Sequence, residues 1–413
     1  MNYSLNIRTK STPTGLLFHR NSLIILLVIL FVALLQNLYS LTMIISLILA
    51  LAFMAKTMSL AILFNVKCRL TLKQKYFFPL DSAAVNIEIA NSKFIPLFWA
   101  RVVVFLPRGI ALGENKAIDG HSSISELEFD FFLNAWHAAR FSPRVVCLRR
   151  GYYPLKKLTL SSGDLFGLYR QTTEFACDEA LVVYPRLYPM KDLAIFSLYP
   201  TCGIAFKEQL FHDHTRTMGV RDYCTSDEFR HIHWKASARR ERLQVKVFEP
   251  TTMGQMALFL PREEFRDEEE LETAISVLAV IAHKAVEQGN SVGFFSNCSL
   301  TDSGKPAAVI PDSNKNKMDV LLESFAKVGS KANCSWEIFF SSISKELRRG
   351  TTLVFAAAQF EAAVCRSLLS LRQAGYKVIV VHPGSRKDNP LQGEVSIYKY
   401  ALQNGYIQCD PQQ

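Results

Sequence analysis

The chain contains 413 residues, of which 49% are hydrophobic and 20% are charged, and its formal net charge is +10. This length exceeds one ordinary domain, and the composition excludes an intrinsically disordered chain. The nine cysteines include no Cys-x-x-Cys pair, so neither a zinc site nor a redox motif is indicated, and the thiols fit a reducing compartment. A basic balance suits anionic lipid, an acidic protein or nucleic acid, but without a long basic run we expect no nucleic-acid partner.

An apolar segment over residues 22–64 is the first predicted element, after an N-terminal tail of residues 1–21. It is too long for a cleaved signal peptide and has no small-residue cleavage site. The polar pair Gln36-Asn37 divides it, which predicts a transmembrane helical hairpin with spans Ser22–Tyr39 and Ser40–Met58. Each span of about 18 residues rises about 27 Å, slightly less than a hydrocarbon core. The alternative is one long tilted helix followed by a buried stretch.

Basic residues lie at both outer ends of the apolar segment, and the turn between the spans carries no charge. By the positive-inside rule, both ends are then cytoplasmic, with the segment in a bacterial inner membrane and the soluble domains in the cytoplasm. The basic residues after the second span alternate along a strand-like run, which suits anionic lipid or an ordinary solvated face. The residues concerned are Arg8, Lys10, Arg20, Lys67, Arg69, Lys73 and Lys75.

Residues 66–189 have the pattern of β structure. The run Ser125–Leu133 alternates cleanly, with apolar side chains at every second position. Gly and Pro turns bound the neighbouring runs, and no helical period interrupts them. Short strands at this spacing predict an immunoglobulin-like β-sandwich. The further predicted strands are Trp99–Pro107, Arg144–Arg149, Leu155–Ser161 and Ala180–Pro185.

Strands and helices alternate over residues 253–405, followed by a tail of residues 406–413. Asp267–Gln288 has one apolar face and three glutamates in its first turn, where the helix dipole favours acids. Alternating strands and helices predict a parallel, doubly wound α/β sheet. The other predicted elements are the strands Gln255–Leu260, Ser291–Ser296, Thr351–Ala357 and Lys377–His382 and the helices Met318–Lys327 and Glu361–Ala374.

A segment dense in charged and aromatic residues lies between these two regions, at residues 190–252. It has the pattern of a turn, a strand and a turn. We expect a structural role at a domain interface, with Trp234 buried there and Arg221, Asp227 and Arg230 in an internal ion-pair network. Arg239, Arg240 and Arg242 are expected to form an exposed basic face. The candidate interface residues are Arg221, Asp222, Tyr223, Asp227, Arg230, His233, Trp234, Lys235, Ser237 and Arg239.

The same segment also permits an enzymatic interpretation. His231 and His233 would share one face of a strand, and with Asp222 and Cys224 they provide ligands for a metal or a Cys–His pair. His212 and His214 repeat the spacing. We favour hydrogen bonding that seats the segment, because such pairs arise readily by chance. No phosphate-binding loop of the ATPase type is present in the sequence, and we predict no catalytic residue, cofactor or metal.

Several motifs resemble the bacterial family of domain of unknown function 58 (DUF58). The sequence Arg150-Gly-Tyr-Tyr153 with Gly163-Asp-Leu-Phe-Gly-Leu-Tyr169 is similar to one family element, and Val182-Val-Tyr-Pro-Arg186 to a second. The third is Arg221-Asp-Tyr223 followed by Ile232-His-Trp-Lys-Ala-Ser-Ala-Arg239. The resemblance implies a membrane protein with a β-sandwich and a C-terminal domain like the von Willebrand factor A domain. It also implies partnership with a MoxR-type AAA ATPase, in an envelope-related or complex-assembly system.

Two departures concern the metal site of von Willebrand A domains. Such a site needs Asp-x-Ser-x-Ser after the first strand, where hydroxyls and a carboxylate bind magnesium. This chain has Leu260-Pro-Arg-Glu-Glu264 there, and Ala356-Ala-Ala-Gln359 after a later strand. We therefore expect a degenerate domain that binds no magnesium.

The leading hypothesis is a membrane-anchored interaction or scaffold protein. Its rival is a metal- or thiol-dependent enzyme centred on Asp222, Cys224, His231 and His233. A third interpretation is a lipid-surface scaffold that uses the lysines next to the membrane. The sequence leaves the oligomeric state open.

Overall fold

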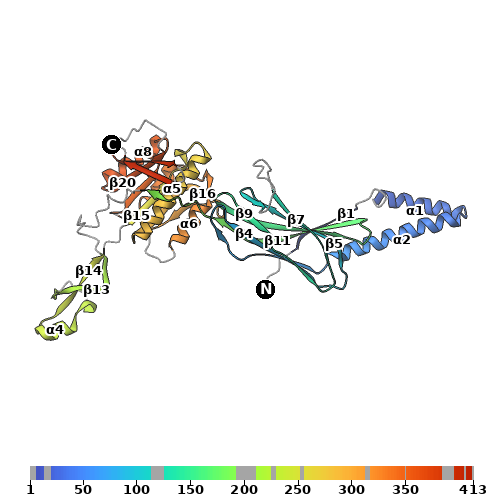
Figure 1. The fold of residues 1–413 in the computed structure, drawn as a ribbon, viewed down its shortest axis with the longest axis horizontal. Helices are drawn as coiled ribbons and strands as arrows, with labels where there is room; N and C mark the ends of the chain where they lie inside the picture. Colours follow the sequence, from blue (N-terminus) through green and yellow to red (C-terminus); the bar gives the residue numbers. More distant parts are fainter. Residues whose placement is uncertain are drawn as a thin grey trace. The chain divides into compact units, whose positions relative to one another are not determined.

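A computed structural model of the chain describes residues 6–13, 20–112, 125–191, 211–224, 229–251, 255–311, 317–348, 350–383, 395–403 and 406–411 (Figure 1). The chain divides into two compact units, Met1–Arg186 and Leu187–Gln413. The first unit holds the apolar helices and two β-sheets, and the second holds a large mixed sheet with helices. The protein is therefore multidomain.

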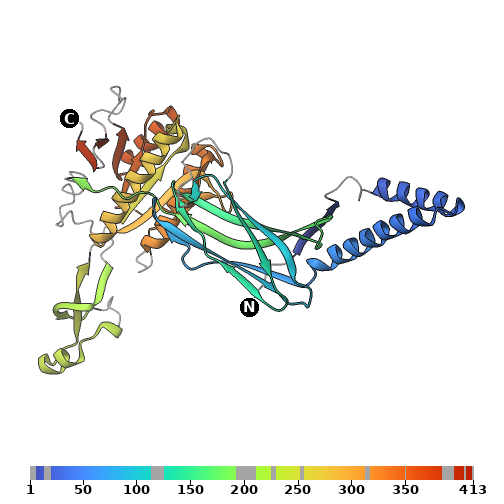
Figure 2. The ribbon, with the colours of Figure 1, turned by 45° about the vertical axis from the view of Figure 1, so that its right-hand side comes forward.

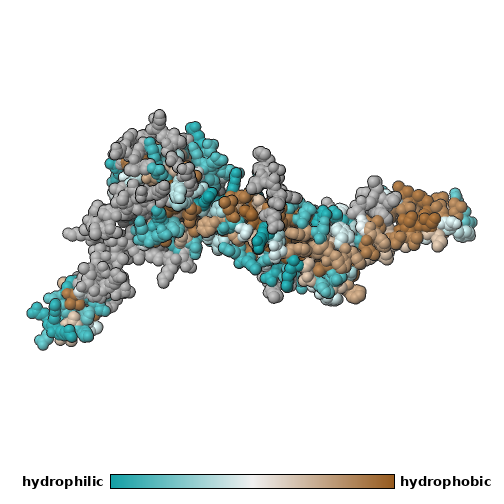
Figure 3. All heavy atoms as spheres, in the orientation of Figure 1, coloured by the Kyte–Doolittle hydropathy of each residue, from teal (hydrophilic) through white to brown (hydrophobic). Residues whose placement is uncertain are grey.

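The apolar segment forms two helices of unequal length, α1 (Arg20–Leu35) and α2 (Tyr39–Ile62). They lie side by side, and their surface is mostly hydrophobic (Figures 2 and 3). The predicted equal spans are wrong: Asn37, at φ 53°, turns the chain after α1, and the apolar sequence continues α2 beyond Met58. Among the described helices, only α2 is long and apolar enough to cross a membrane, and α1 is a shorter apolar helix.

The first sheet of this unit includes a strand from the N-terminal residues. Its order is β1 (Asn6–Pro13), β11 (Tyr169–Val183), β10 (Gly151–Gly163), β5 (Leu97–Leu106) and β7 (Ser125–Leu133), and β3 (Tyr76–Phe77) pairs with β11. Residues 6–13, predicted as part of a tail, form β1, which pairs antiparallel with β11. Pro13 is the last residue of this edge strand, where the missing N–H of proline removes no hydrogen bond from the interior of the sheet.

The second sheet contains β2, β4, β9 and β6, with β8 paired to β4. Their bounds are Val66–Leu72, Ser82–Asn91, Arg144–Cys147, Ile110–Leu112 and Ala138–Phe141 respectively. Alternate side chains of β4 are buried, as expected for a strand with one face in a core. Both sheets contribute to one apolar core, which also contains Ile62 and Leu63 from the end of α2. The last turn of α2 is therefore packed into this core.

The sheet of the second unit has the order β12-β22-β21-β20-β19-β15-β16-β17, and β18 pairs with β16. The strands from β21 to β16 are parallel neighbours. Residues 406–411, predicted as part of a tail, form β22, which pairs with β21. The strands are β12 (Met190–Lys191), β15 (Gln255–Leu260), β16 (Ser291–Leu300), β17 (Pro306–Val309), β18 (Val328–Ala332), β19 (Thr352–Ala356), β20 (Lys377–Pro383), β21 (Ser396–Gln403) and β22 (Tyr406–Pro411).

Helices cover both faces of this sheet. Met256, Leu258 and Leu260 of β15 belong to the apolar cluster of α5 (Glu268–Glu287) and α6 (Lys317–Lys327). Ala257 and Phe259 belong to the cluster of α7 (Trp336–Ile343) and α8 (Ala362–Gln373). Because successive strand side chains point to opposite faces, this division places one helix pair on each face.

A small separate element lies within residues 211–251. Strands β13 (Phe211–Asp222) and β14 (Gln244–Thr251) form an antiparallel pair. Between them come the 3-10 helix η2 (Phe229–His231) and the short helix α4 (Trp234–Arg240). The prediction of a strand at His231–Trp234 is wrong, because His233 caps a helix there. We call β13, η2, α4 and β14 the β13–β14 module.

Candidate functional site

His233 and Ser237 fix α4 within the β13–β14 module. The Nδ1 atom of His233 accepts a hydrogen bond from the Ala236 backbone N–H at 3.1 Å, which caps the helix. The Ser237 hydroxyl donates to the His233 carbonyl at 3.1 Å and accepts from the Gln244 backbone N–H at 2.9 Å. The His233 backbone N–H donates to the Gln244 carbonyl at 2.8 Å. Ser237 therefore ties α4 to the first residue of β14.

Asp222 and Tyr223, which precede α4, are hydrogen-bonded to Gln244, the first residue of β14, and to Leu243 before it. The Gln244 side-chain amide donates to Oδ1 of Asp222, and the Tyr223 backbone N–H donates to the Leu243 carbonyl at 2.9 Å. The Tyr223 ring stacks on Phe229 with centroids 5.7 Å apart. Asp222 and Tyr223 therefore have structural partners inside the module.

Several predicted interface residues lie on the surface of the module. Trp234 was expected to be buried, but its side chain is 69% exposed. The reason is that α4 turns Ser237 inward, so that the first residue of the helix points outward. Arg239, Arg240 and Arg242 are exposed, as predicted for the basic face, and Lys235 is exposed as well. Arg221 is exposed too, and it donates from NH1 to the Asp222 carbonyl at 3.1 Å.

The predicted ion-pair network falls partly outside the described residues. Asp227 is not described, and neither is the side chain of Arg230. The enzymatic interpretation has a similar gap, because the side chains of His212 and His214 are not described. Cys224 is exposed. Within the described residues, no group of three or more His, Cys, Asp or Glu side chains is arranged to hold a metal ion.

A buried carboxylate occupies the carboxyl edge of the parallel sheet in the second unit. Glu264 follows β15 in a 3-10 turn, η3 (Arg262–Glu264), and its side chain is fully buried. Its Oε2 accepts hydrogen bonds from the backbone N–H groups of residues 358, 359 and 360 at 3.1, 2.8 and 2.7 Å. Its Oε1 accepts from the N–H of Glu361 at 2.8 Å. Glu264 thus fills the loop between β19 and α8.

This position is where ligands bind in open α/β sheets. β16, the next parallel strand along the chain, pairs on one side of β15, and β19 pairs on the other, so the strand order reverses at β15. Ligands of such sheets bind beyond the carboxyl ends of the strands at that reversal. Burial raises the pKa of Glu264 above its ordinary value, while the four backbone N–H groups oppose this shift. The chain therefore supplies its own carboxyl group at the customary ligand position.

The neighbouring residues are also bonded to one another. Asn297 donates from Nδ2 to both oxygens of Glu263 at 2.8 Å, and its Oδ1 accepts from the Arg262 backbone N–H at 2.9 Å. Arg262 donates from Nε to the Ser330 carbonyl at 2.6 Å. From its sequence this loop was expected only to be a defective metal site, and the role of Glu264 was not predicted. An acidic pair just after the first strand of an α/β sheet was the available signal.

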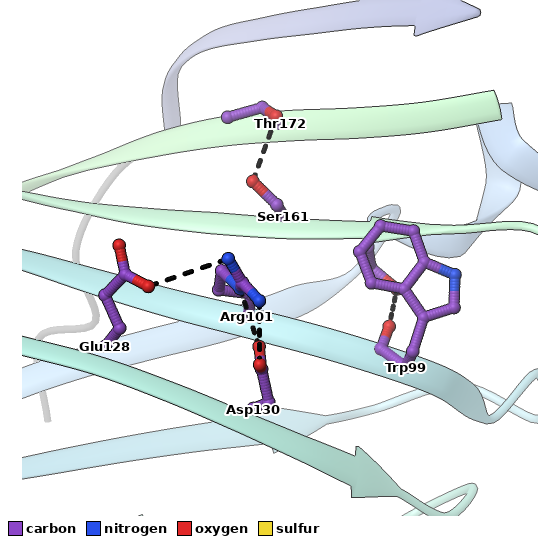
Figure 4. A network of polar contacts seen from close by, with 7 residues as sticks. Trp99, Arg101, Glu128, Asp130, Ser161 and Thr172 are labelled. Carbon is purple, nitrogen blue, oxygen red and sulfur yellow. Dashed lines mark hydrogen bonds and ion pairs between the residues drawn. The ribbon is translucent and has the colours of Figure 1, made fainter. Parts of the chain in front are cut away.

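A shallow depression of about 420 Å³ lies on the outer face of the first sheet, around Trp99. The polar contacts beside it are drawn in Figure 4. Arg101 donates from Nε and NH2 to the two carboxylate oxygens of Asp130 at 2.7 and 2.8 Å. These hydrogen bonds lower the pKa of Asp130. The Arg170 guanidinium lies 5.3 Å from the Trp99 ring centroid. These are solvent-exposed cross-strand contacts, which stabilise a sheet face modestly and indicate no reaction.

The described residues thus define a multidomain protein with an apolar N-terminal helix and an α/β unit. The chain's own Glu264 side chain occupies the carboxyl edge of the α/β sheet. Residues 219–397 match the family model described as "Protein of unknown function DUF58". This range begins in β13 and ends in β21, so it covers most of the second unit. The resembling motifs at residues 150–153 and 182–186 lie before it.

The chain is also similar to the "Uncharacterized protein YeaD" of Bacillus subtilis (strain 168), with 27% identity over 232 residues, 56% of this chain and 54% of that protein. It therefore spans about half the length of this curated relative. A "Putative membrane anchored protein" from Corynebacterium diphtheriae is 14% identical, covering 30% of this chain and 33% of its own, with a TM-score of 0.20. Spo0M, a sporulation control protein from Bacillus subtilis, is 11% identical, covering 29% and 49%, with a TM-score of 0.17. These TM-scores establish no shared fold.

Proposed function

We propose that this protein is a membrane-anchored interaction protein that works with a MoxR-type AAA ATPase. The β13–β14 module and a degenerate von Willebrand A-like domain present its binding surface. The partner class comes from the resemblance of its motifs to the DUF58 family. The process served by the pair is envelope-related or the assembly of another complex.

The connections of the apolar helices support the anchor. β1 precedes α1 and β2 follows α2, and both strands belong to the first unit. A chain that leaves and re-enters one folded unit must cross a membrane an even number of times. If α2 crosses, α1 must cross as well, which favours a two-span hairpin. At 16 residues α1 is about 24 Å long, a mismatch that local thinning of the bilayer can accommodate. The flanking basic residues support a location of the soluble units in the cytoplasm of a bacterial cell.

The sheet of the second unit supports the von Willebrand A-like assignment. Its central order β17-β16-β15-β19-β20-β21, with β17 antiparallel, is that of a doubly wound fold reversing at β15. Glu264 fills the edge where a metal or substrate would be held. This arrangement favours a binding protein over an enzyme.

The exposure of two aromatic rings on the β13–β14 module is the observation that carries the proposal. Trp234 is 69% and Phe229 is 71% exposed, beside the basic side chains of α4. Exposed Trp surrounded by Arg is typical of residues that dominate protein–protein binding energy. The basic surroundings suit an acidic partner surface.

Affinity capture of the tagged full-length chain from native membranes tests the proposal. We expect a MoxR-type ATPase with the unchanged chain and a loss of about tenfold or more with Trp234→Ala. Ile338→Ala removes an equally exposed apolar side chain from α7 and is the matched control, for which we expect unchanged recovery. Equal recovery with Trp234→Ala, or no such ATPase with the unchanged chain, would overturn the proposal.

A further inference from the structure

Four loops that are distant in sequence lie at one end of the first unit's β-sheets. This is the end at which α2 leads into β2. β2 starts at Val66, which pairs with Asn91 at the end of β4. β5 starts at Leu97, which pairs with Leu133 at the end of β7. The turn between β10 and β11 is next to them, because Ser162 of β10 pairs with Ala100 of β5. We call this region the helix-bearing end and define it as residues 63–65, 92–96, 134–137 and 164–168.

Polar side chains hold these loops in place, and two of them, Asn91 and Asp164, are buried. Asn91 donates from Nδ2 to the carbonyls of Ile95 at 3.0 Å and Asn134 at 3.1 Å. The buried carboxylate of Asp164 accepts from the backbone N–H groups of residues 166, 168 and 169 at 3.0, 3.3 and 2.7 Å. Asn65 donates from Nδ2 to the Ser92 carbonyl at 3.0 Å. The loop tips are therefore positioned by the fold.

Each of these fixed loops exposes a large apolar side chain at its tip. Phe94 is 82%, Phe64 is 75% and Trp136 is 68% exposed, and Leu165 and Phe166 are each more than half exposed. Trp136 also has a φ of 60°, a conformation that bulky side chains seldom adopt. Single exposed apolar residues are ordinary, but five on four adjoining loops form a patch that indicates an interaction surface.

The length of α2 identifies the occupant of this patch as the lipid bilayer. Its 24 residues rise about 36 Å, whereas a hydrocarbon core is about 30 Å thick. The last turn of α2 and the residues after it then lie in the headgroup layer. Ile62 and Leu63 are packed into the core of the first unit. The helix-bearing end therefore lies at the depth of the headgroup layer as well. Lys56 is exposed near the end of α2, where its amine can reach the headgroups.

We infer that the helix-bearing end is itself a membrane-contacting surface, whose aromatic loop tips enter the bilayer interface beside α2. Tryptophan favours that layer, because its ring is largely apolar while its N–H can meet water. The neighbouring Phe and Leu side chains are apolar and can enter the boundary of the acyl chains. The inference rests on the proposed membrane anchor and adds that the first unit is seated directly on the lipid. Its effect is to restrict the tilt of the first unit relative to the membrane.

Fluorescence quenching in vesicles tests this inference. The full-length chain is reconstituted into vesicles of phosphatidylethanolamine and phosphatidylglycerol whose acyl chains are brominated near the headgroup. We expect tryptophan quenching that is largely lost in Trp136→Phe. Phe94→Trp adds a reporter at an exposed loop tip and should gain quenching. Leu80→Trp is the matched control, because Leu80 is an exposed apolar residue at the opposite end of the sheets, and it should gain none.

The outcomes separate the inference from the anchor on which it rests. Vesicle flotation first establishes whether the chain is held by the membrane. Flotation without quenching of Trp136 or of Phe94→Trp overturns the inference and leaves the anchor intact. A gain for Leu80→Trp equal to that of Phe94→Trp overturns it too, because contact would not be confined to the helix-bearing end. Failure of the unchanged chain to float overturns both.

Discussion

Glu264 is the residue on which the carboxyl edge of the α/β sheet depends. Its two oxygens accept four backbone N–H groups from residues 358–361, and these donors lie in the turn that begins α8. Buried N–H groups without acceptors are costly, so the loop after β19 needs an acceptor at this position. A carboxylate from the loop after β15 provides it and joins the two central strands.

Replacing Glu264 by Gln should destabilise the full-length chain by about 1–3 kcal/mol, because one oxygen becomes an N–H donor that faces another donor. Denaturant unfolding of the chain in detergent measures this loss. Glu337→Gln changes an exposed carboxylate paired with Arg366 and is the matched control, which should stay within about 0.5 kcal/mol. Equal stability of the two variants would contradict the role given to Glu264.

The raised pKa of Glu264 gives a distinct dependence of stability on pH. Because the folded state binds this proton more tightly than the unfolded state, its contribution is greatest below the ordinary pKa of 4.5. It is lost as the pH rises through the folded-state pKa. The difference in unfolding free energy between the natural chain and Glu264→Gln should therefore shrink with rising pH in that window. A difference that grows with rising pH would instead mean that the four hydrogen bonds lower the pKa of Glu264 more than burial raises it.

Truncation to alanine should cost much more stability at Trp336 than at Trp234. Trp336 is fully buried against Phe259 and Phe355 and donates to Ser367, so Trp336→Ala should cost about 3–5 kcal/mol. Trp234 is exposed, so Trp234→Ala should change stability by less than about 0.5 kcal/mol. Thermal unfolding of both variants checks this. A large loss for Trp234→Ala would contradict the exposed position of the ring.

At the scale of elements, the β13–β14 module depends on polar contacts more than on an apolar core. Ile232 and Val245 are its buried apolar residues among those described, and they form an isolated β-bridge. The hydrogen bonds of His233, Ser237 and Gln244 fix α4 against β14. A helix of seven residues is too short to be stable alone, so these contacts decide whether it forms.

Ser237→Ala should therefore loosen α4. The substitution removes the acceptor of the buried Gln244 N–H, at a cost of about 1–3 kcal/mol to the module. Hydrogen exchange of the α4 amides should become faster, while exchange in α5 stays unchanged. Lys235→Ala, which alters an exposed side chain of the same helix, serves as the control. Unchanged exchange in Ser237→Ala would show that other contacts hold the helix.

At the scale of the whole molecule, the two apolar helices are connected at both ends to strands of the first unit. β1 and β2 flank α1 and α2, so the residues before and after the helices belong to one folded body. This connection constrains topology more strongly than the apolar length of each helix, because a folded unit cannot lie on both sides of a membrane.

Asn37 marks the turn between the two helices and should face the outside of the cell membrane. A membrane-impermeant thiol reagent added to intact cells should label Asn37→Cys. The natural chain is the control and should stay unlabelled, because its nine cysteines are expected on the cytoplasmic side. Labelling of the natural chain, or protection of Asn37→Cys, would contradict the two-span topology.

Local periodicity was sufficient to predict many elements. The alternation in Ser125–Leu133 matches β7, and the apolar run Gln255–Leu260 matches β15, because each pattern repeats with the period of a half-buried or fully buried strand. The helix predicted over Asp267–Gln288 corresponds to α5. These signals are carried by residues close together in the chain, and so they can be read without the fold.

The sequence by itself determined an apolar helix near the N-terminus, a β-rich region and an alternating α/β region. Only the tertiary structure decided that residues 6–13 and 406–411 complete sheets, since pairing to β11 and β21 depends on strands distant in sequence. It also decided the outward position of Trp234 and the inward position of Glu264. The physical reason is that burial depends on which distant groups a side chain meets, and four N–H groups some 95 residues away set the environment of Glu264.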